Sequence, residues 1–133
     1  MGKTANLRNI ILIVLAGTTL LLIGSAQAEN EPPQATIDSI APDPAWDTQN
    51  VTFRGHGNDS DGTVAALAWH SSRDGNLSQV PEFTLRGLSA GNHTVSFRVQ
   101  DDNGTWSANA TASLTVFHNG LPLAALNLST TQL

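Results

Sequence analysis

Residues 59–69 read Asp59-Ser60-Asp61-Gly62-Thr63-Val64-Ala65-Ala66-Leu67-Ala68-Trp69, an acidic turn followed at once by an apolar run. Glycine and short acidic residues favour a tight reversal of the chain. The uninterrupted apolar run that follows is typical of a buried strand. Counting back from Trp69 in steps of two, we expect Leu67 and Ala65 to share its face. We therefore interpret Trp69 as the centre of the core of a small β-sandwich.

Short alternating segments surround this stretch, separated by turn-forming residues. The clearest spans residues 93–100, where Val95, Phe97 and Val99 alternate with polar residues. Such alternation predicts strands with one buried face, and no window after residue 28 has the apolar period of a helix. We expect an all-β, immunoglobulin-like β-sandwich of about seven strands. Its predicted strands include residues 35–38, 50–57, 64–69, 83–86, 93–100 and 110–116.

The first 28 residues have the pattern of a secretory signal peptide. Lys3 and Arg8 precede an apolar run over residues 10–23, and Ala26 and Ala28 provide small residues for cleavage. We expect a helical leader that is cleaved after Ala28, because the run is shorter than the roughly 20 residues that span a bilayer. The sandwich domain is predicted over residues 29–117. The mature chain is expected to be extracellular, secreted or at the cell surface, without stable insertion into a membrane.

Charge and cysteine content exclude several classes of function. The predicted mature chain keeps four basic and eleven acidic residues, a net charge of −7. Its four arginines are scattered and not interleaved with aromatic residues, which argues against nucleic acid as a partner. The chain has no cysteine, so neither a disulfide nor a lipidated cysteine contributes to the exported module.

The motifs of common enzymes are absent. The sequence has no G-x-S-x-G, no H-E-x-x-H, no cysteine nucleophile and no glycine-rich phosphate loop. The four histidines are scattered, and we interpret them as outward-facing polar residues. The sequence therefore predicts a noncatalytic protein with no certain cofactor.

Three motifs resemble those of the PKD (polycystic kidney disease) domains and their PKD-like relatives, over about Pro33 to Val116. The motifs are the acidic turn before the Trp69 strand, residues 89–95 (SAGNHTV) entering the penultimate strand, and residues 99–104 (VQDDNG) leaving it, with Trp106-Ser107 after. The sequence departs from the W-D-F-G-D-G run of the best-known signature, with residues 69–75 (WHSSRDG) in its place. The resemblance implies an immunoglobulin-like module of the kind that recurs on bacterial and archaeal surface proteins and secreted hydrolases.

The acidic turns are a candidate metal site. In a sandwich with alternating strands, Asp59, Asp61 and Asp101 would lie at the same end and could converge, and carboxylate oxygens suit calcium. The resemblance points the same way, because some PKD domains bind calcium there. Alternatively, these acids occur in the turns for backbone reasons alone. Both interpretations stay open, and Asp102 is expected to face solvent.

Asparagine sequons are unusually frequent. Seven of the nine asparagines after residue 28 lie in N-x-S/T motifs, more than the roughly two expected by chance, which indicates exposure to a glycosylation system. A turn-rich β composition also raises this number. The candidate glycosylation sites are Asn50, Asn58, Asn76, Asn92, Asn103, Asn109 and Asn127.

Residues 118–133 form a predicted tail. Residues 119–126 can be aligned with residues 30–37, keeping Asn, Pro, Ala and a branched aliphatic residue in register, as if a second repeat began there. An unrelated disordered tail is the alternative.

For function we expect a noncatalytic structural, adhesion or spacer module whose partners are neighbouring domains, a cell-surface protein or polysaccharide. The alternative is an accessory carbohydrate- or protein-binding domain that targets a linked secreted hydrolase.

Overall fold

The computed structural model describes residues 10–15 and 18–120. They belong to two compact units that divide between Glu31 and Pro32 and are treated separately. In the first unit β1 (Ile10–Leu15) and β2 (Thr18–Ile23) pair antiparallel. The structure has strands in these two segments where the sequence predicts a helix, and the signal peptide itself stays a prediction. Both are rich in β-branched Ile, Val and Thr, which favour extended backbone.

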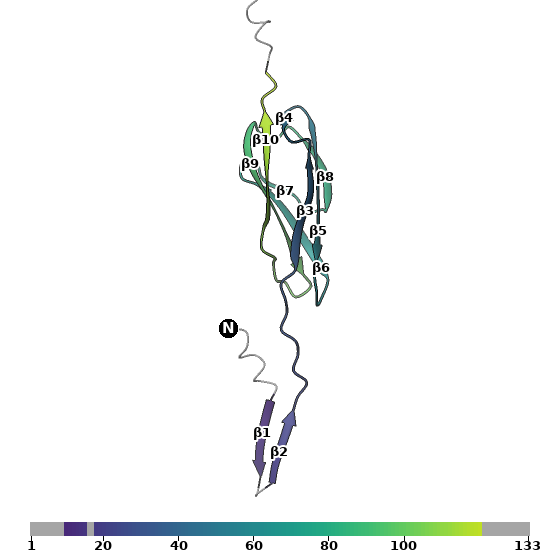
Figure 1. The fold of residues 1–133 in the computed structure, drawn as a ribbon, viewed down its shortest axis with the longest axis vertical. Helices are drawn as coiled ribbons and strands as arrows, with labels where there is room; N and C mark the ends of the chain where they lie inside the picture. Colours follow the sequence, from purple (N-terminus) through teal and green to yellow (C-terminus); the bar gives the residue numbers. More distant parts are fainter. Residues whose placement is uncertain (1–9, 16–17, 121–133) are drawn as a thin grey trace, which may run out of the picture. The chain divides into compact units, whose positions relative to one another are not determined.

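The second unit is a β-sandwich of two sheets (Figure 1), as the sequence predicts. One sheet has three strands in the order β3-β5-β8, and the other has five in the order β4-β10-β9-β6-β7. No helix occurs among residues 10–15 and 18–120, so none there could cross a membrane. The strands are β3 (Gln34–Ala41), β4 (Ala45–Trp46), β5 (Asn50–Asn58), β6 (Val64–Ser71), β7 (Gly75–Ser78), β8 (Glu82–Arg86), β9 (Gly91–Asp101) and β10 (Ala110–Phe117).

Aromatic rings fill the space between the sheets around Trp69. The Trp69 side chain is 1% exposed and stacks on Phe97 with ring centroids 4.3 Å apart. Its edges meet Phe53 and Phe83, which stack on each other. The prediction that Trp69 is central to the core is confirmed. The buried hydrophobic residues are Ala45, Val51, Phe53, Trp69, Leu88, Val95, Phe97, Val99, Leu114 and Val116.

Two of the predicted facings are wrong. In β6 a bulge between Val64 and Ala66 shifts the register against β9. Val64 consequently packs against the core, whereas Ala65 is exposed. One extra residue in a strand exchanges its inward and outward positions, so counting back from Trp69 fails beyond the bulge. His93 is the second exception: it is buried, on the same face of β9 as Val95.

Trp46 packs on the outside of the sandwich. It lies in β4, which pairs in parallel with the end of β10. Ala45 is buried there, but the Trp46 side chain is 46% exposed and tilts against Phe117, with ring centroids 5.4 Å apart. The ring therefore covers the final strand at this end of the sandwich rather than entering the core.

The chain enters and leaves the sandwich at opposite ends. Gln34 pairs with Asn58, just before the acidic turn. This turn lies beside the end of β9, because the Asp102 amide donates to the Thr63 carbonyl (3.0 Å). β10 runs the other way along β9 and ends with Val116 opposite Gly91. Figure 1 shows the same arrangement, with the start of β3 and the tip of β10 at the two ends of the sandwich.

Candidate functional site

The acidic turn between β5 and β6 gathers carboxylates around Gly62. A Cβ atom at Gly62 would lie 2.7 Å from Asp59 Oδ2 and 2.5 Å from Asp102 Oδ1. Both carboxylates therefore use the space that glycine leaves open, so this turn needs glycine for room. Asp102 is exposed, as expected, and its Oδ1 accepts a hydrogen bond from the Thr63 amide (3.1 Å).

The surroundings of Asp59 disfavour the charged form of its carboxyl. Desolvation raises the pKa of its carboxyl, and a hydrogen bond with Asp61 and the negative charges of Asp61 and Asp101 raise this pKa further. Within the described part of the chain, Oδ2 of Asp59 is a buried oxygen with no hydrogen-bond partner. The Asp59 carboxyl is therefore close enough to Asp61 and Asp101 to be affected by their charges.

The fit of a cation to these residues is partial. Asp101 is 1% exposed, and its Oδ1 accepts hydrogen bonds from the amides of Asn103 (3.0 Å) and Thr105 (2.7 Å), a backbone role in its own turn. Across residues 10–15 and 18–120, no group of three or more His, Cys, Asp or Glu side chains is arranged to hold a metal ion. The unpartnered oxygen of Asp59 would gain from a cation, but a complete set of ligands is not assembled. Calcium binding at Asp59, Asp61 and Asp101 stays a prediction.

The candidate glycosylation sites lie on the surface wherever the structure describes them. Asn127 lies outside the described residues. The other six asparagines are all exposed, which a sequon requires before a glycan can be attached. They are Asn50, Asn58, Asn76, Asn92, Asn103 and Asn109.

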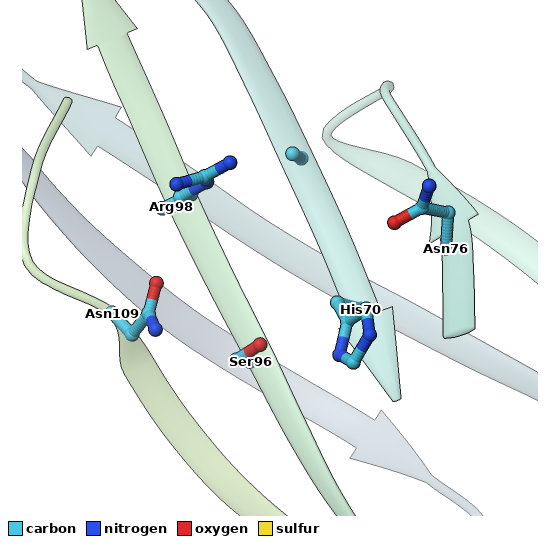
Figure 2. Close-up of a pocket in the computed structure, with 6 residues that line it drawn as sticks. His70, Asn76, Ser96, Arg98 and Asn109 are labelled. Carbon is cyan, nitrogen blue, oxygen red and sulfur yellow. The ribbon is translucent and has the colours of Figure 1, made fainter. Parts of the chain in front are cut away.

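A shallow groove crosses the outer face of the five-stranded sheet. It consists of two adjoining hollows of ≈ 210 Å³ and ≈ 380 Å³ that share Ala68, Asn76 and Arg98. Figure 2 shows Arg98 and Ser96 on the central strand, between Asn109 on one side and His70 and Asn76 on the other. Ala68 on β6 lines both hollows, and its small side chain leaves room in the groove at this point. The groove residues with polar side chains are His70, Asn76, Ser78, Gln79, Ser96, Arg98 and Asn109.

Trp106 and Arg98 form a composite surface in the groove. The Arg98 guanidinium carbon lies 4.3 Å from the centroid of the Trp106 ring, a cation–π contact. Trp106 is held beside β9 by a bridge to Gln100. No aspartate or glutamate lines either hollow. The groove therefore combines a cation, an indole ring, the His70 imidazole and several amides and hydroxyls, which are groups that can bind a polar ligand.

Ser71, His93 and Asp74 come together below the surface, but not in the geometry of a nucleophilic triad. His93 Nε2–H donates to the Ser89 carbonyl (2.6 Å), so Nδ1 accepts from the Ser71 hydroxyl (2.7 Å). Asp74 lies 3.8 Å from this same Nδ1, not from the opposite nitrogen as in a triad. The Ser71 side chain is buried and also accepts hydrogen bonds from the amides of Arg73 and Asp74. These hydrogen bonds stabilise the turn between β6 and β7.

The sequence matches the model of the PKD domain family over residues 35–120. This match covers more than half of the chain. The chain belongs to the PKD domain family. The resemblance carried by the three sequence motifs is thereby confirmed. No curated protein sequence matches the chain.

Solved structures agree with this assignment. The PKD1 domain of Vibrio anguillarum Epp is 27% identical, with a TM-score of 0.51 over 66% of this chain and 99% of that domain. A structure of carbohydrate-binding modules from the β-sandwich superfamily is 28% identical, with a TM-score of 0.60, and covers 69% of this chain but 37% of its own. The PKD1 domain of the Vibrio cholerae metalloprotease PrtV shares the fold, at 22% identity and a TM-score of 0.54, over 65% of this chain and 99% of that domain.

The groove on the PKD domain cannot be predicted from the sequence alone. Arg98 reads as one of four scattered arginines, and Trp106 follows a turn several residues later. The only available signal is the outward register of Arg98 on β9, which places it on a face that the core does not cover. Its contact with Trp106 depends on how the chain returns along β9 after residues 101–104.

Proposed function

We propose that this PKD domain is a noncatalytic spacer module of an extracellular protein, which separates or presents its neighbouring domains. PKD domains occur in extracellular proteins, and the family match supports placing this one there. The position of the two chain ends carries the proposal. Entry beside Asn58 and exit beside Gly91 lie at opposite ends of the sandwich, so each domain extends a multidomain chain by its own length.

Contacts at the exit end support this role. Asp47 Oδ2 accepts a hydrogen bond from His118 Nδ1 (2.7 Å), and Oδ1 accepts from the Asn119 amide (3.0 Å). The Asn119 side chain donates to the Thr48 hydroxyl (3.1 Å). The hydrogen bonds from Asn119 and His118 lower the pKa of the Asp47 carboxyl. The first residues after β10 are therefore held against the domain, which fixes the direction in which the chain leaves.

The length of linked copies tests the spacer role. β9 has 11 residues, and at about 3.3 Å per residue each copy should add about 36 Å or more to the maximum dimension measured by small-angle X-ray scattering. The comparison is between one, two and three copies of residues 29–120 joined directly. A matched series with long Gly/Ser linkers reports the contribution of the linker. Directly joined copies that fold back, with little growth in maximum dimension, would refute the spacer role.

A second candidate role is that of an accessory binding domain, and the groove on the five-stranded sheet favours it. Trp106, Arg98 and the surrounding amides form a concave polar surface outside the core. The similarity at 28% identity to a structure of carbohydrate-binding modules supports sugar as the ligand. The two roles are compatible, because the groove lies on a sheet face and the chain ends lie at the two ends of the sandwich. The binding role is tested with polysaccharides, as described below.

A further inference from the structure

The groove is a positively charged surface on an acidic protein. The chain carries eleven Asp and Glu residues, yet none lines either hollow. Arg54 is paired with Glu82 at 3.0 Å. In contrast, no ion pair joins a carboxylate to Arg98 among the described residues. Its exposed guanidinium is therefore available to a negatively charged ligand.

The shape and position of the groove favour a sugar over a peptide strand. Its floor is formed by β6 and β9, which are interior strands with partners on both sides. A peptide cannot add to the sheet over this floor, since strand addition needs a free edge, and the free edge of the sheet lies beyond the wall that β7 forms. The hollows are open depressions with both polar and apolar lining residues.

The chemical groups of the groove match those of a carboxylated sugar. A guanidinium binds a carboxylate through two parallel hydrogen bonds, which is the strongest pairing available to a surface arginine. The side chains of Asn76, Asn109 and Ser96 offer donors and acceptors to sugar hydroxyls. The indole of Trp106 offers an apolar surface to the C–H groups of a pyranose ring.

We propose that this groove binds a uronate-containing polysaccharide, with Arg98 pairing to a carboxylate and Trp106 contacting the adjoining sugar ring. The proposal rests on the second of the two proposed roles and names the class of ligand. The proposal also has a consequence for the sequons at Asn76 and Asn109. Both are exposed sequon asparagines on the wall of the groove, so a glycan attached to either would compete with the polysaccharide.

The test uses the purified full-length protein from a host that lacks N-glycosylation. Polygalacturonate and alginate are the acidic probes, dextran is the neutral probe and polyglutamate is the acidic peptide probe, compared by affinity electrophoresis and titration calorimetry. We expect binding to one or both acidic polysaccharides and little to dextran. Arg98→Gln should weaken this affinity by about tenfold or more, because a charge-assisted pair is lost. The affinity of Arg98→Lys should lie between those of the unchanged protein and of Arg98→Gln, since lysine keeps the charge but cannot form two parallel hydrogen bonds.

Two matched substitutions serve as controls. Arg86→Gln removes another exposed arginine from β8, on the other sheet, and Trp46→Ala removes the exposed tryptophan at the exit end. Neither should change the affinity, whereas Trp106→Ala should weaken it. Thermal melting of each variant shows whether it is folded. If Trp106→Ala lowers the melting temperature strongly, the comparison of Arg98→Gln with Arg86→Gln decides.

Several outcomes would overturn the proposal. Equal losses in Arg98→Gln and Arg86→Gln would mean that net charge alone attracts the polymer. Equal binding of polyglutamate would mean that the groove does not recognise sugar. Binding of dextran with equal strength would keep the accessory binding role but reject uronate recognition. No binding of any polysaccharide would reject the groove proposal and leave the spacer role to the scattering experiment.

Discussion

Replacing Trp69 with alanine is the most direct test of the core. The indole is 1% exposed, lies 4.3 Å from Phe97 between ring centroids, and meets Phe53 and Phe83 edge-on. Its Nε1–H donates to the Val80 carbonyl at 3.1 Å. Trp69→Ala removes all of these contacts and leaves a cavity between the two sheets.

The expected loss in the free energy of unfolding is about 3–5 kcal/mol, the usual cost of truncating a buried aromatic residue to alanine. The lost hydrogen bond adds little, because Val80 is 49% exposed and water can reach its carbonyl. A domain of this size loses roughly 4–8 °C in melting temperature for each kcal/mol. The melting temperature should therefore fall by roughly 12–40 °C. Since total stabilities are about 5–15 kcal/mol, the variant could be partly unfolded at room temperature.

Trp46→Ala is the matched control. Its ring is 46% exposed and has one ring contact, with Phe117. Its loss should cost about 1 kcal/mol or less. Circular dichroism in the far ultraviolet follows thermal and urea unfolding of both variants without relying on tryptophan fluorescence. Equal and small losses in the two variants would mean that the ring cluster around Trp69 is not the core, and the reasoning would fail.

Further predictions concern the turns, the sheets, the sequons and the leader. If Asp59, Asp61 and Asp101 bind calcium, millimolar calcium should raise the melting temperature, and Asp59→Asn should abolish the increase; no shift and no heat in calorimetry would leave these acids as turn formers. Without calcium, the raised pKa of Asp59 means that its contribution to stability is present at low pH and is lost as the pH rises through that pKa, so Asp59→Asn should stabilise the protein at pH 7. Gly55→Ala should cost about 1–3 kcal/mol in urea unfolding, because its Cβ would lie 2.7 Å from Trp69 Cζ2 and 2.9 Å from the Thr36 carbonyl oxygen; an unchanged midpoint would show that the sheets can separate there. Expression in a glycosylating host should give an intact mass with added glycans that falls stepwise as the exposed sequon asparagines become glutamine, and a single unmodified mass would reject glycosylation. The exported protein should begin at Glu29 by N-terminal sequencing, and retention of Met1 in a membrane fraction would reject cleavage.

The sequence determined the fold class and most strand faces, because a strand with one buried side must alternate. Val95, Phe97 and Val99 are all 0% exposed, as their spacing predicts. The acidic turn and the PKD motifs likewise act locally, through backbone preferences that neighbouring residues reveal.

Tertiary structure alone decided the remaining features, because they depend on residues brought together from distant positions. The bulge that turns Val64 inward is set by pairing with β9. The burial of His93 depends on two partners that satisfy its ring nitrogens: the Ser71 hydroxyl on β6, and the Ser89 carbonyl four residues earlier in the chain. The groove exists because Arg98 and Trp106 meet across a turn, on a sheet face shared with β6 and β7. A sequence pattern indicates which side of a strand a residue occupies, but only packing determines which other side chains it meets there.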